Sequence, residues 1–249
     1  MDLVTVSFDQ PRRVATLTLN RPDKRNALSI ALLQSLIDAC ASLNREPDLR
    51  AVVVTGAGVR AFSAGFDLND FASGDRSGMH LGGAATDALD RVKAVTIAAI
   101  QGSCIGGGVV LASACDLRIA ATNTIFKIPE IDLGIPLGWS GLPRLVRELG
   151  PAVAKELILT CRGFDAFEAK ALRFVNQVVE PPELHAAAQE MARSIAAKPR
   201  LGVLLTKQQA RIASENMVAT HQSDMDAVLI AAAGTDEESR ATSRAYLAK

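Results

Sequence analysis

The 249-residue chain is poor in aromatic side chains, which make up 4% of its residues, with one tryptophan and one tyrosine. Small aliphatic side chains must therefore fill the core, and the elements that carry them must pack closely. Cysteine is also scarce: Cys40, Cys104, Cys115 and Cys161 are not closely paired and stand inside apolar patterns. Their positions predict buried, reduced thiols rather than a disulfide framework.

The chain also lacks a surplus of charge and a long apolar run. Lys and Arg number 27, Asp and Glu number 27, and the formal net charge of +0 does not favour nucleic acid as a partner. Apolar runs such as 51–54 and 97–100 are far shorter than the roughly 20 residues that span a bilayer. The first residues, 1–4, lack the basic and apolar regions of a signal peptide. We therefore expect a cytoplasmic protein that does not enter a membrane.

Hydrophobic periodicity predicts a layered α/β fold. Strands at 3–8 and 14–19 should form a hairpin, and Ser29 should cap a helix that continues to about residue 43. Continuous apolar runs at 50–55, 95–101 and 117–122 predict strands covered on both faces. The glycines within 73–83 predict a surface loop. Further helices are expected at 142–149, 151–161, 167–172, 182–197, 201–233 and from residue 236, with one strand at 175–179.

Two glycine-rich segments suggest different structures. The segment from Gly56 to Ala61 matches the dinucleotide pattern G-x-G-x-x-A, but the residues after it have no helical stripe, so a turn is expected. Gly106-Gly107-Gly108 follows an apolar strand and precedes a helix of small residues. Its bare backbone N–H groups could stabilise developing negative charge at the helix N-terminus, or the glycines could simply form a tight turn.

Glu130 is a candidate general acid or base, because it stands in an apolar segment bounded by Pro129 and Gly134. A carboxylate desolvated there would have a raised pKa, which suits proton transfer near neutral pH. A solvated or ion-paired glutamate is the alternative. Other chemistries are less favoured: Gly138-Trp139-Ser140-Gly141 lacks the final glycine of a nucleophile elbow, and no Cys/His spacing fits a metal site.

Five segments, taken in order, carry a family resemblance. They are Asn20-Arg21-Pro22 with Arg25-Asn26-Ala27-Leu28, Ala61 to Leu68, Gly102 with Gly106-Gly107-Gly108, Cys115 to Ala120, and Pro129-Glu130 with Leu133-Gly134. Together they resemble the enoyl-CoA hydratase/isomerase (crotonase) superfamily over nearly the whole chain. The resemblance implies an α/β spiral of repeated ββα units in residues 1–198 and a C-terminal α-helical trimerisation region in 199–249, both in one functional unit. It also implies an acyl-CoA thioester as ligand, no cofactor beyond that coenzyme A, and a homotrimer or a dimer of trimers.

The resemblance further implies how the site works. The N–H groups of Phe66 and Gly107 would hold the thioester oxygen, and Glu130 would transfer protons. Lys24 and Arg25 would lie near the CoA phosphates and the backbone of Ala64 near the adenine. The acyl pocket candidates are Phe71, Leu81 and Trp139. Ala27, Gly65, Asp67, Leu68, Gly106, Val110, Pro129 and Gly138 complete the expected substrate-binding set.

One position departs from the family pattern. Hydratases of this family have a second glutamate 20 residues before the first, and this chain has Val110 there. A single carboxylate suits a proton shuttle that converts a 3-enoyl-CoA to the 2-enoyl-CoA, so isomerisation is slightly favoured. The alternatives are a hydratase in which Glu130 works with a water and another acid such as Asp70, and a non-catalytic acyl-CoA binding protein. A nicotinamide oxidoreductase based on the segment at Gly56 is a distant fourth.

Overall fold

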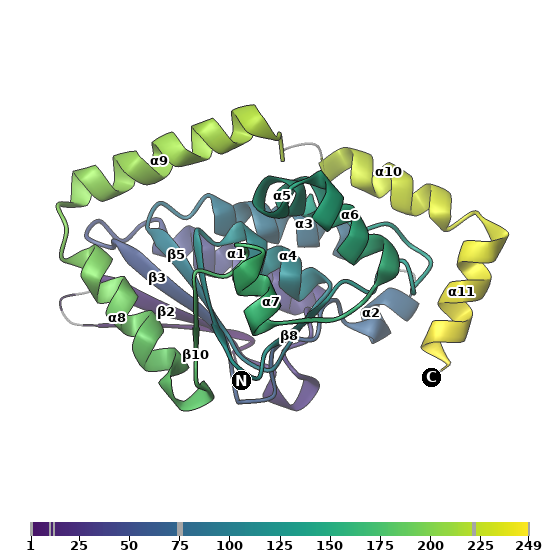
Figure 1. Cartoon of the computed structure of the whole chain (residues 1–249), viewed down its shortest axis with the longest axis horizontal. Helices are drawn as coiled ribbons and strands as arrows, with labels where there is room; N and C mark the ends of the chain where they lie inside the picture. Colours follow the sequence, from purple (N-terminus) through teal and green to yellow (C-terminus); the bar gives the residue numbers. More distant parts are fainter. Residues whose placement is uncertain (1, 10, 12, 74–76, 221–222, 249) are drawn as a thin grey trace.

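The computed structural model describes residues 2–9, 11, 13–73, 77–220 and 223–248 (Figure 1). Its larger sheet has the strand order β1-β2-β3-β5-β7-β10. These strands are β1 (Val4–Phe8), β2 (Val14–Leu19), β3 (Ala51–Gly56), β5 (Val95–Ile100), β7 (Leu117–Ala121) and β10 (Gln177–Val179). The predicted hairpin is confirmed, because β1 pairs with β2 antiparallel, whereas the other neighbours pair in parallel.

A second, smaller sheet gives the fold its repeat. It has the order β4-β6-β8-β9, formed by β4 (Ala61–Ser63), β6 (Ser103–Ile105), β8 (Ile125–Lys127) and β9 (Phe164–Asp165). The helices that follow the strand pairs are α1 (Ile30–Leu43), α2 (Leu68–Ala72), α3 (Ser77–Asp90), α4 (Gly107–Ala114) and α5 (Gly141–Leu149). The long strands β3, β5 and β7 are each followed by a short strand of the second sheet, namely β4, β6 and β8, and then by a helix, which is the expected ββα spiral. The four short strands were not predicted, because two or three residues carry no periodicity.

Both faces of the central strands are covered, as their continuous hydrophobicity predicts. Val52, Val54 and Ala98 belong to the main core, together with α1 and α4. Val53 and Ile97 point to the opposite face, where they pack with α8 (Leu184–Ala196). All six residues of β3 are buried. The alternation along each strand therefore separates two cores rather than a core from solvent.

The helical C-terminal half begins with α5 and continues through α6 (Pro151–Thr160), α7 (Ala166–Ala171), α8, α9 (Arg200–Met217), α10 (Ser223–Ala233) and α11 (Glu237–Leu247). Figure 1 shows α9, α10 and α11 in succession around the outside of the body. The single helical pattern expected over 201–233 is wrong in one respect, because it forms two helices. Val218 ends α9 in an extended conformation, which breaks the helix before α10.

The surface loop expected at residues 73–83 is also wrong, because residues 77–83 begin helix α3. Gly82 of this segment serves close packing instead of a turn: a Cβ there would lie 1.8 Å from the Trp139 ring. Residues 74–76 lie outside the described residues. The segment after Gly56 bends directly into β4 without forming a helix, so the expected turn is confirmed and the dinucleotide pattern has no helix to support it.

The cysteine prediction is confirmed, since all four are free and buried. Within the described part of the chain, no helix is both long and apolar enough to cross a membrane.

Candidate active site

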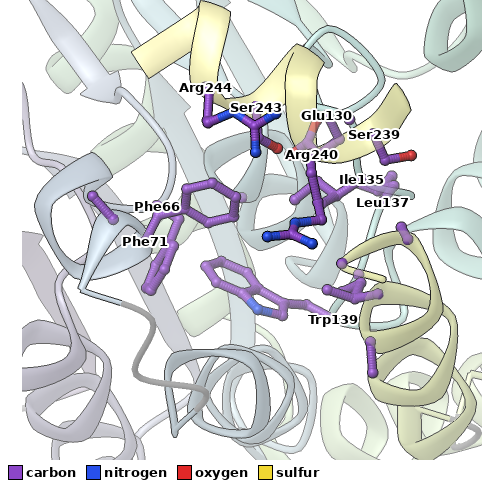
Figure 2. Close-up of a pocket in the computed structure, with 18 of the residues that line it drawn as sticks. Phe66, Phe71, Glu130, Ile135, Leu137, Trp139, Ser239, Arg240, Ser243 and Arg244 are labelled. Carbon is purple, nitrogen blue, oxygen red and sulfur yellow. The ribbon is translucent and has the colours of Figure 1, made fainter. Parts of the chain in front are cut away.

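A cavity of about 640 Å³ lies between the ββα body and the C-terminal helices α10 and α11 (Figure 2). Most of its wall is apolar or small. Its lining is Phe66, Phe71, Ala72, Gly107, Val110, Glu130, Gly134, Ile135, Leu137, Gly138, Trp139, Ile230, Ala231, Ala233, Gly234, Ser239, Arg240, Ser243 and Arg244. Such a concave, largely apolar cavity with a few polar groups is typical of a small-molecule site.

Glu130 is the one carboxylate among the described residues that line this cavity. It lies in the turn after β8, where its backbone oxygen accepts hydrogen bonds from the N–H groups of Leu133 and Ile135. The residue is 9% exposed, and its Oε2 atom is buried without a hydrogen-bond partner. Burial raises the pKa of Glu130 from 4.5 to about 7. This confirms the predicted desolvated acid and makes it able to exchange a proton near neutral pH.

Gly106 makes room for this carboxyl group. A Cβ at this position would lie 2.5 Å from Glu130 Oε1, and its φ of +50° is unfavourable for other residues. Gly106 is also the N-cap of α4, so the acid lies against the N-terminal end of that helix. A residue with a side chain here would displace the carboxyl group.

Two backbone N–H groups of the cavity wall are free to bind a ligand. Phe66 and Gly107 both line the cavity, and neither donates a backbone or side-chain hydrogen bond within the described residues. A Cβ on Gly65 would lie 3.6 Å from the Gly107 nitrogen, so the link between Gly65 and Phe66 runs close to the Gly107 amide. Gly107 is the first residue of α4, where the helix dipole favours negative charge.

Trp139 forms another part of the wall. Its ring meets Phe66 edge to face, with centroids 5.7 Å apart, and lies across Gly107, where a Cβ would be 2.3 Å from the ring. A side chain at position 107 would therefore collide with Trp139. Trp139 and Ser140 adopt positive φ values of 60° and 56°, and the Ser140 N–H donates to Asp226 Oδ2 of α10 at 2.7 Å.

Helix α11 closes the cavity on the side of Glu130. Its Ser243 hydroxyl donates to the Leu133 carbonyl oxygen, in the turn that carries the acid. Gly134 in the same turn has φ +74°, and a Cβ there would lie 2.3 Å from the Ser239 oxygen. This close packing directs Arg240 and Arg244 toward the cavity, as Figure 2 shows.

Seven of the residues expected from the sequence come together in this lining: Phe66, Phe71, Gly107, Val110, Glu130, Gly138 and Trp139. Four others flank them in the chain without lining the cavity themselves, namely Gly65, Asp67, Gly106 and Pro129.

The remaining expected residues lie outside the cavity. Lys24 and Arg25 are exposed, and Leu68 is 46% exposed on α2. The Ala64 N–H donates to the Arg25 oxygen, which joins the segment at Arg25 to that before Phe66, and the Ala27 oxygen accepts from Arg21. Leu81, expected in the acyl pocket, packs instead against the main core, because α3 turns it inward.

Two carboxylates that were expected to bind substrate or act as an acid form hydrogen bonds outside the cavity instead. Asp67 pairs with Arg21 at 2.8 Å and accepts from the Asn69 N–H as the N-cap of α2. Asp70, the suggested second acid, does not line the cavity, because its Oδ2 accepts from the Ile30 N–H at the start of α1, at 2.8 Å. Both side chains therefore stabilise helix N-termini.

Sequence reasoning missed the contribution of the C-terminal helices, which supply Ile230, Ala231, Ala233, Gly234, Ser239, Arg240, Ser243 and Arg244 to the lining. The spacing of Ser239, Arg240, Ser243 and Arg244 at i, i+1, i+4 and i+5 is the one available signal, since it places four polar residues on one face of a helix. The described residues contain no group of three or more His, Cys, Asp or Glu that could hold a metal ion.

Comparison with known proteins connects this site to a chemistry. The sequence profile of the family described as Enoyl-CoA hydratase/isomerase matches residues 9–249. The chain is 37% identical over 213 residues to the short-chain-enoyl-CoA hydratase of Clostridium acetobutylicum, covering 84% of this chain and 81% of that protein. It resembles the crystal structure of an enoyl-CoA hydratase from Bacillus anthracis with a TM-score of 0.82 and 35% identity, covering 91% and 89% of the two chains. A monofunctional enoyl CoA isomerase from M. smegmatis gives a TM-score of 0.75 and 33% identity, covering 86% and 95%.

Proposed function

The chain belongs to the enoyl-CoA hydratase/isomerase family, and we propose that it adds water across the C2–C3 double bond of a 2-enoyl-CoA bound in the cavity. The observation that carries this proposal is the pairing of one buried acid with two unused backbone N–H groups on the same cavity wall. The acid is Glu130, whose pKa burial raises to about 7. The N–H groups are those of Phe66 and Gly107.

The proposed reaction begins with Glu130 as a carboxylate. It takes a proton from a water molecule while the water oxygen bonds to C3 of the acyl chain. The electron pair of the double bond moves toward C2 and the thioester oxygen, which becomes negatively charged. Glu130 then returns the proton to C2, so the product has gained one water and the acid is restored. A pKa near 7 allows one group to act as base and then as acid.

The Phe66 and Gly107 N–H groups hold the thioester oxygen when its charge develops. Because they have no other partner within the described residues, they need not break a hydrogen bond to do so. A single preorganised donor of this kind contributes about 3 to 4 kcal/mol to transition-state stabilisation. The N-terminal position of Gly107 on α4 adds to the effect.

The coenzyme A part is proposed to lie outside the cavity. Lys24 and Arg25 are exposed cations that can bind its phosphates. The hydrogen bond from the Ala64 N–H to the Arg25 oxygen keeps them next to the segment that carries the Phe66 N–H. Ala27, Gly65, Asp67, Leu68 and Pro129 belong to the proposed binding surface through their backbone or their neighbours. No cofactor beyond the coenzyme A of the substrate is required.

Isomerisation is the second candidate, and Val110 favours it. This residue lines the cavity where a second carboxylate would assist hydration. With Glu130 alone, the carboxylate can take a proton from C2 of a 3-enoyl-CoA and return it to C4, which gives the conjugated 2-enoyl-CoA. The named relatives favour hydration instead, and for this reason hydration stands first.

The purified protein should convert crotonyl-CoA to its 3-hydroxy product, and Glu130→Gln should lower kcat about 10²- to 10⁴-fold, because the proton-transfer group is lost. Product analysis by nuclear magnetic resonance with crotonyl-CoA and 3-hexenoyl-CoA separates hydration from isomerisation. Glu190→Gln, which removes an exposed carboxylate of α8, is the matched control and should leave the rate unchanged.

Undiminished turnover by Glu130→Gln would rule out the assigned acid. Tight binding of both thioesters without any product would instead identify an acyl-CoA binding protein.

A further inference from the structure

Two arginines give the apolar cavity an unexpected positive charge. Arg240 and Arg244 are one turn apart on α11, and both line the cavity. Figure 2 shows Arg240 extending from α11 toward Phe66 and Trp139, with Arg244 on the same side of the helix. Residues at this spacing share one helix face, so the two guanidinium groups approach the same space.

Neither guanidinium has an ion-pair partner within the described residues. In the described residues, no carboxylate forms an ion pair with Arg240 or Arg244, and neither side chain makes a hydrogen bond. Two other arginines of the helical C-terminal half do form ion pairs. Arg144 pairs with Asp87 at 2.9 Å, and Arg147 pairs with Glu215 at 2.9 Å.

The position of these arginines is fixed by packing rather than by charge. Ser243 donates to the Leu133 oxygen, and Ser239 meets the bare Cα of Gly134. Both contacts are on the same face of α11 as the arginines. Arg240 and Arg244 are both exposed, so water solvates their charges, and both remain available to an anion that enters the cavity.

Guanidinium groups bind carboxylate and phosphate oxygens in a fork geometry, so the missing partner is an anionic group of the ligand. Coenzyme A carries phosphates, but its proposed cations, Lys24 and Arg25, do not line this cavity, whereas Arg240 and Arg244 do. The cavity that contains Glu130 and the two free N–H groups holds the acyl part. The anion that reaches Arg240 and Arg244 is therefore on the acyl chain.

We propose that the preferred substrate is an enoyl-CoA whose acyl chain ends in a carboxylate, and that Arg240 and Arg244 bind this carboxylate. This proposal rests on the proposed function of the same cavity. The two arginines would set substrate specificity without transferring a proton.

Two five-carbon substrates that differ only at their far end test the proposal: glutaconyl-CoA, which ends in a carboxylate, and 2-pentenoyl-CoA, which ends in a methyl group. We expect the wild-type kcat/KM to be at least about tenfold higher for glutaconyl-CoA. Arg240→Gln and Arg244→Gln should each lower it about tenfold for glutaconyl-CoA, the loss of one charge-assisted contact, and change it less than about twofold for 2-pentenoyl-CoA. Arg200→Gln, an exposed arginine outside the cavity, is the control and should change neither value.

A wild-type preference for 2-pentenoyl-CoA would overturn the proposal. Equal losses on both substrates in the arginine variants would overturn it too, because they would show that the arginines hold the coenzyme A part.

Binding measurements keep this test independent of turnover. Calorimetry with glutaryl-CoA, pentanoyl-CoA and free coenzyme A uses ligands that cannot react by hydration. Tighter binding of glutaryl-CoA, lost in Arg240→Gln while free coenzyme A binds unchanged, would support the carboxylate site even if no hydration were found. Weaker binding of free coenzyme A by Arg240→Gln would assign the arginines to its phosphates and overturn the proposal.

Discussion

At the residue scale, the proposed chemistry depends on how Glu130 is buried. Gly106 leaves space for its carboxyl group, and the turn after it is tied together by backbone hydrogen bonds to the Glu130 oxygen. Without an ion-pair partner, the charged form is penalised by burial, and the pKa rises from 4.5 to about 7. The acid proposed to transfer protons is therefore also a source of instability when it ionises.

The pH dependence of stability should reveal this cost. Between about pH 4.5 and pH 7 the folded state binds more protons at Glu130 than the unfolded state, so the free energy of unfolding falls as pH rises through this window. Glu130→Gln removes the effect. The variant should unfold with a free energy about 3 kcal/mol higher than wild type near pH 8, and similar to wild type below about pH 4.5, in urea titrations followed by circular dichroism.

The kcat/KM of the wild type should in turn rise with pH and level off above about 7, because the proposed reaction begins from the carboxylate of Glu130. A wild type as stable as Glu130→Gln at all pH values would contradict the raised pKa.

At the element scale, the cavity wall depends on the close approach of helices to one aromatic ring. Trp139 lies between α3, at Gly82, and α4, at Gly107. Its positive φ is strained for a residue with a side chain, and the hydrogen bond from the next residue, Ser140, to Asp226 of α10 helps to hold it. The glycine in α3 thus allows helix and ring to meet.

Gly82→Ala should disturb this contact. The added Cβ would lie 1.8 Å from the Trp139 ring, so the variant should lose about 1 to 3 kcal/mol of unfolding free energy. Because Trp139 is the single tryptophan, its fluorescence emission should shift at the same time. Gly202→Ala in α9 is the matched control: its Cβ meets nothing within 4 Å, and it should be neutral or stabilising by up to about 1 kcal/mol. Equal stability of the two variants would refute the packing argument.

At the scale of the whole molecule, helix α9 exposes apolar side chains that packing within one chain does not cover. The helix has 18 residues and no buried ones, and Leu201, Leu205 and Ile212 on one face are 65%, 53% and 51% exposed. Exposed apolar side chains gathered on one face are typical of an interface. The homotrimer or dimer of trimers expected from the family resemblance would cover them.

Light scattering after size-exclusion chromatography should therefore give a mass of three or six chains for the wild type. Leu205→Glu combined with Ile212→Glu should lower that mass, because two charges would have to be buried in the interface. Arg200→Gln on the same helix should leave it unchanged. A wild-type monomer at about 10 µM would contradict the predicted assembly.

Local sequence pattern determined much of this protein. The helix from Ser29, the strands at 50–55 and 95–101, the free cysteines and the desolvated Glu130 could all be predicted, because each depends on neighbours within a few residues. The glycines at Gly106 and Gly107 could be recognised as the start of a helix with bare N–H groups. The collision of a side chain at position 107 with Trp139 could not be predicted, because the two residues are 32 positions apart in the chain.

Only the tertiary structure decided how the cavity closes and what lines it. Asp70 was a plausible second acid from the sequence, but its carboxylate accepts a hydrogen bond from the Ile30 N–H of α1. Leu81 was a plausible pocket residue, but it packs against the main core. Arg240 and Arg244 are exposed residues of a polar helix, and only the tertiary structure shows that they line the same cavity as Glu130. Periodicity shows which face of a helix is polar, but the neighbour of that face is chosen by packing between distant segments, and no local pattern contains that information.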